Sequence, residues 1–99
     1  MAARSVLITG CSQGGAGEAL ARRFHRGGFR VFATARNLVK IEHLRLEGIE
    51  ILELDILENQ SVAKVASSVS DMTGGTLDIL INNAGGGMSV LIFRLTYTC

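Results

Sequence analysis

The chain has 99 residues, of which 47% are hydrophobic and 19% are charged, and its formal net charge is +1. This length allows one modest core, and the composition is that of a folded domain rather than a disordered segment. A net charge near zero provides no broad field that would attract nucleic acid or an acidic membrane surface.

The two cysteines predict no disulfide framework, because neither their number nor their spacing demands a secreted fold. The N-terminal apolar run is too short for a signal peptide or a membrane span. We therefore expect an intracellular, cytoplasmic protein without a transmembrane segment, and no feature of the sequence predicts a metal site.

Apolar runs and amphipathic stretches alternate along the first half of the chain. Residues 6–8 form a continuous apolar run, which is typical of a strand buried on both faces of a parallel sheet. A glycine-rich turn follows at residues 10–17, and apolar residues at four-residue spacing then predict an amphipathic helix that ends at Gly27 and Gly28. Residues 29–35 are predicted to form the second strand.

The same alternation continues in the second half. The predicted elements are a helix capped by Asn37 and ended by Gly48, a strand over 49–54, a helix starting at Asn59 or Ser61 and ended by Gly74, and a strand over 77–82. The tail at residues 88–99 matches no helix signal, and it is either a short strand or a frayed end.

Strands that alternate with helices through short loops require right-handed crossovers and a parallel sheet. The fold class is therefore α/β, with a Rossmann-type parallel sheet of strand order 3-2-1-4 and helices on both faces. The chain is long enough for about half of a doubly wound sheet.

The segment from Thr9 to Gly17 lies between a buried strand and an amphipathic helix. Its glycines permit a tight turn, and the backbone amides together with the positive end of the helix favour a pyrophosphate. Gly17 also allows the helix to pack closely on the strand. A tight turn without a ligand remains the alternative, because a glycine-rich string alone is weak evidence.

A phosphate-binding loop of the nucleotide-hydrolysing type is excluded. Gly10 and Gly15 have the required spacing, but Ala16 and Gly17 stand where the lysine and the hydroxyl residue belong. Without them the loop has neither the phosphate-binding charge nor the magnesium ligand.

Arg36 follows the second strand, at the position that distinguishes NAD from NADP. An acidic residue there binds the ribose hydroxyls of NAD, whereas a cation accommodates the extra phosphate of NADP. The guanidinium of Arg36 suits a phosphate, so NADP(H) is preferred over NAD. A solvated arginine at the end of a strand is the alternative.

Two further segments follow predicted strands at the carboxyl edge, where open α/β sheets bind ligands. The carboxylate of Asp55 is placed to accept a hydrogen bond from an adenine amino group, or instead to cap the next loop. Residues 82–85, with the sequence Asn-Asn-Ala-Gly, end the fourth strand and let the chain pass close to a flat ligand.

Four segments taken together resemble the short-chain dehydrogenase/reductase family, and the match extends to Gly85. They are Thr9-Gly10-x-x-x-x-Gly15-x-Gly17, Ala35-Arg36, Leu54-Asp55-Ile56 and the stretch from Asp78 to Gly85. The glycine turn has one residue more than the commonest form, and with residues 31–36 it resembles the 1-acyldihydroxyacetone-phosphate reductase subgroup.

The resemblance implies a nicotinamide nucleotide as ligand and assigns the residues around it. Gly10, Ser12, Gln13, Gly15 and Gly17 would line the pyrophosphate, Arg36 the 2′-phosphate, Asp55 and Ile56 the adenine, and Asn83, Ala84 and Gly85 the nicotinamide-side ribose. The family transfers hydride between NAD(P)H and a carbonyl or alcohol, with a tyrosine as acid/base and lysine, serine and asparagine as helpers. The subgroup also makes an endoplasmic-reticulum or lipid-droplet surface compatible with the sequence.

The chain departs from the family after Gly85. Its single tyrosine, Tyr97, is followed only by Thr98 and Cys99, so it does not form Tyr-x-x-x-Lys. We expect residues 1–87 to form an NADP-binding Rossmann half-domain, and residues 88–99 to be a tail outside the family pattern in a C-terminally truncated chain. No catalytic residue is assigned.

Three functions are compatible with these features to different degrees. The sequence argues against an active reductase, because the chain lacks the tyrosine that acts as acid/base and positioned proton transfer supplies much of the rate. An inactive NADP-binding module fits best. A non-catalytic interaction module, self-associating through an exposed edge of the fourth strand, stays open unless residues 90–93 cover that edge.

Overall fold

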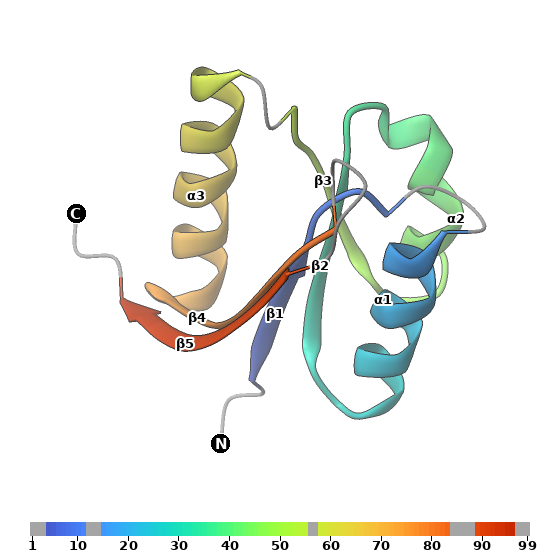
Figure 1. The fold of residues 1–99 in the computed structure, drawn as a ribbon, viewed down its shortest axis with the longest axis horizontal. Helices are drawn as coiled ribbons and strands as arrows, with labels where there is room; N and C mark the ends of the chain where they lie inside the picture. The colour runs from blue at the N-terminus through green and yellow to red at the C-terminus, as the bar shows by residue number, and fades with distance from the viewer. Residues whose placement is uncertain (1–3, 12–14, 56–57, 84–88, 97–99) are drawn as a thin grey trace.

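A computed structural model describes residues 4–11, 15–55, 58–83 and 89–96. The strands are β1 (Ser5–Ile8), β2 (Arg30–Ala35), β3 (Glu50–Glu53), β4 (Thr76–Asn82) and β5 (Ser89–Thr96). The helices are α1 (Ala16–Arg26), the 3₁₀ helix η1 (Leu38–Ile41), α2 (Glu42–Arg45) and α3 (Asn59–Thr73). One sheet lies between α3 on one face and α1 with α2 on the other (Figure 1).

The sheet has the strand order β3-β2-β1-β4-β5. The strands from β3 to β4 pair in parallel, with Val6 opposite Val31 in β2 and opposite Ile79 in β4. The predicted α/β fold with strand order 3-2-1-4 is therefore confirmed.

The tail adds the fifth strand. β5 runs antiparallel to β4, with Ile81 opposite Val90 and Leu77 opposite Leu95. The tail was predicted to be either a short strand or a frayed end. Residues 89–96 form a strand, and its eight residues make it the longest of the sheet. The prediction that β4 presents an exposed edge is wrong, because β5 pairs along that edge.

The continuous apolar run of β1 supplies both cores. Val6 and Ile8 pack on the face covered by α1 and α2, with Val31 and Leu44 in the same cluster. Leu7 points to the opposite face, where it joins the core of Phe32, Leu54, Val65, Val69 and Leu77. This is the two-sided burial that a non-alternating strand predicts.

The helix ends largely follow the predicted signals. Gly74 ends α3 in the left-handed conformation with φ of 72°, and the backbone N–H of Gly75 donates to the carbonyl of Ser70 at 2.9 Å. α3 begins at Asn59, which was one of the two predicted starts. Ser61 has another role, because its hydroxyl accepts a hydrogen bond from the backbone N–H of Asp55 at 2.9 Å.

The segment after Asn37 is not the single α-helix that the sequence predicts. Asn37 does cap it, since its side chain accepts from the backbone N–H of Val39 at 3.0 Å. Leu38 is half-buried and Ile41 and Leu44 are buried, and their spacing of three fits a 3₁₀ helix as well as a short α-helix. The chain forms η1 first and then the single turn α2.

Among the described helices, none is both long enough and apolar enough to cross a membrane.

Candidate functional site

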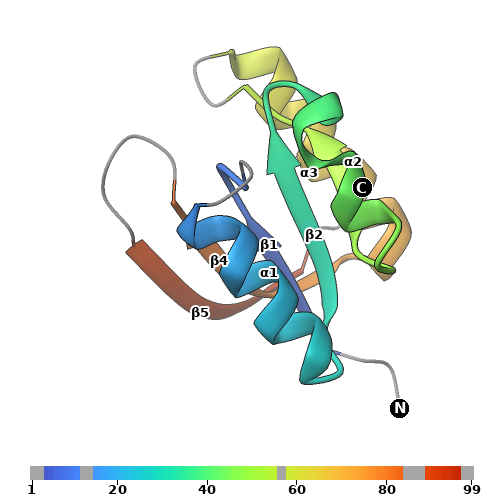
Figure 2. The ribbon, with the colours of Figure 1, turned by 90° about the vertical axis from the view of Figure 1, so that its right-hand side faces the viewer.

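The carboxyl ends of three adjacent strands are tied together by hydrogen bonds just before α1 begins. The backbone N–H of Thr9 donates to the carbonyl of Ile81 at 3.0 Å, and that of Cys11 donates to the carbonyl of Thr34 at 2.9 Å. The hydroxyl of Thr9 donates to Oδ1 of Asn82 at 3.1 Å and accepts from the backbone N–H of Asn83 at 2.9 Å. Figure 2 shows that the start of α1 and the arrowhead of β2 lie at the same end of the sheet.

Gly17 lies where α1 approaches these strand ends most closely. A Cβ atom on Gly17 would lie 2.8 Å from Nδ2 of Asn83 and 2.8 Å from the carbonyl oxygen of Gly10. The same Asn83 amide donates to the Gly10 carbonyl at 3.2 Å, and Gly10 has φ of 68°. Only glycine fits at position 17 without a shift of its neighbours, so the close packing predicted for this residue is present.

Cys11 lies among these hydrogen bonds and is fully buried. Its Sγ contacts the carbonyl oxygen of Ile8 at 3.3 Å. Burial raises the pKa of the Cys11 thiol to about 11, the backbone hydrogen bond with Thr34 opposes the rise, and the charge of Glu18 adds to it. The thiol is therefore protonated at neutral pH and is not a nucleophile.

A hollow of about 300 Å³ lies at the carboxyl end of β2. Its lining consists of Ala35, Arg36, Asn37 and Lys40. Both cations are exposed, and none of the described residues that line the hollow is a carboxylate. The hollow thus brings two positive charges together, as an anion site requires.

Arg36 was predicted from the sequence as a site residue, whereas Lys40 was not. The available signal was the capping role of Asn37, which turns the chain into η1. That turn brings Lys40 back to the side on which Arg36 lies.

Asp55 follows β3 at the same edge of the sheet and is half-buried. Its backbone joins β3 to α3, because its N–H donates to the hydroxyl of Ser61 at 2.9 Å and its carbonyl accepts from the N–H of Glu58 at 3.0 Å. These bonds position the residue beside the edge, and its adenine contact stays a prediction.

The other predicted site residues divide into two groups. Gly15 is the N-cap of α1 in extended backbone conformation, and Gly10, Gly17 and Asn83 meet beside it as described above. The predictions for Ser12, Gln13, Ile56, Ala84 and Gly85 fall outside the described residues.

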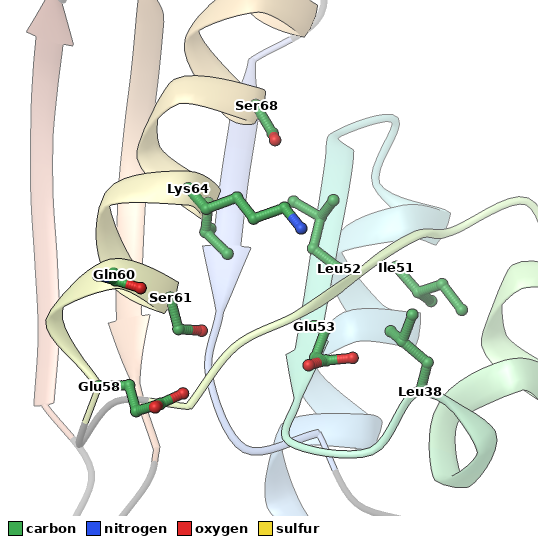
Figure 3. Close-up of a pocket in the computed structure, with 10 residues that line it drawn as sticks. Leu38, Ile51, Leu52, Glu53, Glu58, Gln60, Ser61, Lys64 and Ser68 are labelled. Carbon is green, nitrogen blue, oxygen red and sulfur yellow. The ribbon is translucent and has the colours of Figure 1, made fainter.

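A larger hollow, of about 420 Å³, lies along β3 and holds none of the predicted site residues. It is bounded by β3, α3 and Leu38 of η1, and the side chain of Lys64 extends from α3 toward β3 (Figure 3). Carboxylates of Glu53 and Glu58 lie at its lower end in that view. The Lys64 side chain is therefore on the side of α3 that faces β3.

The arrangement can bind an anionic nucleotide along the carboxyl edge. The glycine turn supplies close backbone approach at the start of α1, and the hollow beyond β2 supplies two cations. Gly17 itself is buried against Gly10 and Asn83, so the exposed part of this edge that suits an anion is the cationic hollow one strand away.

Comparisons with known proteins agree with this geometry. The family model described as short chain dehydrogenase matches residues 4–96. A short-chain dehydrogenase, cctT, of Talaromyces islandicus is 53% identical over 83 residues, which are 83% of this chain and 29% of that protein. The NADPH-dependent 1-acyldihydroxyacetone phosphate reductase of Schizosaccharomyces pombe is 48% identical over 88 residues, which are 89% of this chain and 30% of that protein.

Solved structures show the same fold. The crystal structure of YwfH, an NADPH-dependent reductase involved in bacilysin biosynthesis, superimposes with a TM-score of 0.77 at 28% sequence identity. The superposition covers 87% of this chain and 39% of that one. The chain thus spans less than half the length of the relatives it matches. It belongs to the short-chain dehydrogenase family, whose members are oxidoreductases that bind a nicotinamide nucleotide.

Proposed function

We propose that this chain is the NADP(H)-binding portion of a short-chain oxidoreductase. The observation that carries the proposal is the hollow at the end of β2, which is lined by Arg36 and Lys40 and, within the described ranges, by no carboxylate. A carboxylate at this place would bind the free ribose hydroxyls of NAD, whereas two cations fit a 2′-phosphate. NADP(H) is therefore preferred over NAD.

The remaining contacts are proposed along the same edge. The pyrophosphate lies against Gly10, Ser12, Gln13, Gly15 and Gly17, the adenine against Asp55 and Ile56, and the nicotinamide-side ribose against Asn83, Ala84 and Gly85. Support comes from the close approach of Gly17, Gly10 and Asn83, which brings the first turn of α1 against the carboxyl ends of β1 and β4.

The names of two similar proteins also support NADP(H). The Schizosaccharomyces pombe relative is called NADPH-dependent, and so is the bacilysin-pathway reductase of known structure. Carbonyl reduction or alcohol oxidation by hydride transfer is the reaction we propose for the whole protein.

These 99 residues do not perform that reaction alone. Their single tyrosine, Tyr97, has no lysine four positions after it, so the pair that donates a proton in this family is absent from this stretch. Nucleotide binding without a positioned proton donor supplies orientation but no acid/base catalysis.

The alternative function, an interaction module that pairs through the edge of β4, has lost its structural basis. β5 already pairs along that edge. The nucleotide-binding proposal needs no such edge.

Charge reversal of Arg36 tests the proposal. Arg36→Glu should raise the Kd for NADP at least about tenfold, because it removes a charge-assisted contact with the 2′-phosphate and adds repulsion. The Kd for NAD, which has no 2′-phosphate, should change by less than about twofold. Isothermal titration calorimetry measures both.

Arg23→Glu is the matched control, since Arg23 is an exposed arginine on α1 outside the hollow and the variant has the same net charge. Equal losses of NADP and NAD affinity in Arg36→Glu, or equal losses of NADP affinity in both variants, would contradict the 2′-phosphate assignment.

A further inference from the structure

The hollow at the end of β2 is lined by one short stretch of the chain, which runs from Ala35 to Lys40. Its two cations are held in different ways. Arg36 directly follows β2, and the sheet fixes its position, because the carbonyl of Ala35 accepts a hydrogen bond from the backbone N–H of Leu54 at 2.9 Å. Lys40 belongs to η1, so its position depends on how that turn is held.

Asn37 forms the turn that leads from Arg36 to Lys40. Its Oδ1 accepts a hydrogen bond from the backbone N–H of Val39 at 3.0 Å, and its carbonyl oxygen accepts one from the backbone N–H of Lys40 at 3.1 Å. Asn37 has φ of −125° and ψ of 111°, which is the extended conformation of a helix N-cap. The residue therefore holds the two backbone amides that determine where the Lys40 side chain leaves the chain.

η1 depends on this cap because it has only four residues, Leu38–Ile41. A turn so short has too few hydrogen bonds of its own to offset the cost of starting a helix. The inner side of η1 is held by Ile41, which is fully buried, and by the half-buried Leu38. The outer side carries Lys40, which is exposed. Packing thus fixes the inner side, whereas the Asn37 side chain fixes the outer side.

We propose that Asn37 is a positioning residue for NADP(H): by capping η1 it holds Lys40 beside Arg36, where Lys40 binds the 2′-phosphate as the second cation. This inference rests on the proposed function. It divides the nucleotide site into two parts that act separately. The Asn37 cap affects the 2′-phosphate alone and sets the preference for NADP over NAD, whereas the glycine turn before α1 contributes equally to the binding of both nucleotides.

Asn37→Ala tests the cap without changing the net charge. The preference for NADP, measured by calorimetry as the Kd for NAD divided by the Kd for NADP, should fall roughly threefold to fivefold. The loss is modest because Lys40 is exposed and solvent screens its charge. The Kd for NAD itself should change by less than about twofold, since NAD has no 2′-phosphate.

Asn37→Ser is the matched variant, because serine caps helices about as well as asparagine and is also uncharged. It should keep the preference for NADP within about twofold of that of the unmodified chain. A direct contact between the Asn37 amide and the phosphate would be lost in both variants. Equal losses of preference in Asn37→Ala and Asn37→Ser would therefore overturn the positioning role.

A double-mutant cycle tests whether Asn37 acts through Lys40. Lys40→Gln alone should also lower the preference for NADP roughly threefold to fivefold. In the Lys40→Gln background, Asn37→Ala should cause no further loss, because the group that the cap positions is already absent. Lys64→Gln is the control for the change in charge, since Lys64 is the other lysine of the chain and lies on α3 outside this hollow. It should leave the preference unchanged.

Circular dichroism verifies that each variant is folded, and Lys40→Gln alters only an exposed side chain. An unchanged preference in Lys40→Gln or in Asn37→Ala would overturn the inference, and so would losses that multiply in the double variant. Each of these results would leave the proposed function intact, because the unmodified chain would still bind NADP through Arg36. Absence of NADP binding to the unmodified chain would overturn both.

Discussion

The residues around the glycine turn show how backbone contacts rather than exposed functional groups define the site. Gly17 is surrounded by the Gly10 carbonyl and the Asn83 amide, and Cys11 is closed off by Ile8 and Thr34. Burial keeps the Cys11 thiol neutral and inert.

The Cys11 thiol predicts a measurable dependence of stability on pH. Its pKa is about 11 in the folded chain against an ordinary value of 9.0, so the unfolded chain loses this proton first as the pH rises. The contribution of Cys11 to the free energy of unfolding is fully present below pH 9 and is lost as the pH rises toward 11.

Urea unfolding at about pH 8 and about pH 10 measures this contribution. Cys11→Ala should lose less stability between the two pH values than the unmodified chain, because the other groups titrate equally in both. A larger or equal loss in the Cys11→Ala variant would contradict the burial of a neutral thiol.

Single residues could be predicted from the sequence where one local steric or hydrogen-bonding rule determines the residue type. Gly17 and the cap at Asn37 follow from local rules. The place of Lys40 in the hollow and the 2.5 Å contact between Oε2 of Glu18 and Nε2 of His43 do not, because their partners come together only when η1 and α2 fold back beside α1. Contacts between helices depend on crossing geometry that local spacing does not contain.

Among the elements, α1 illustrates how one position sets the distance between a helix and the sheet. Gly17→Ala should lower the free energy of unfolding by about 1–3 kcal/mol, because its Cβ would overlap backbone at Gly10 and force α1 outward. The same shift should weaken NADP binding. Urea unfolding and calorimetry measure the two effects.

Gly27 provides the control for that substitution. It has φ of −79°, and an added Cβ would meet the Phe24 carbonyl at an ordinary 3.4 Å. Gly27→Ala should therefore be neutral or stabilising by up to about 1 kcal/mol, through the unfolded state. If both alanine variants behaved alike, the close approach at Gly17 would not limit the packing of α1.

The elements also show where pattern reading fails. Continuous apolar runs predicted the parallel strands, because a strand that is buried on both faces of a sheet has no alternation of apolar and polar residues. Spacing of three at Leu38, Ile41 and Leu44 fits both a short α-helix and a 3₁₀ helix, and only the tertiary packing decided between them. β5 carried no helix signal, but its pairing with β4 is a long-range contact that local propensity does not specify.

For the molecule as a whole, strand order was predictable because alternating strands and helices are typical of the Rossmann order, in which the fourth strand returns to the far side of the first. The resulting edge places the glycine turn, Arg36 and Asp55 at the ends of neighbouring strands. Their grouping is a consequence of topology, since parallel strands all end at one side of the sheet. The reaction itself belongs to the longer relatives, of which this chain spans about 30%.

The central claim is that these residues bind NADP(H) through its 2′-phosphate. Titration of the unmodified chain with NADP and with NAD, at about pH 7 in the same buffer, tests it most directly. We expect saturable one-to-one binding of NADP with a Kd at least about tenfold below that of NAD. Absence of saturable NADP binding, or equal affinity for the two nucleotides, would contradict it.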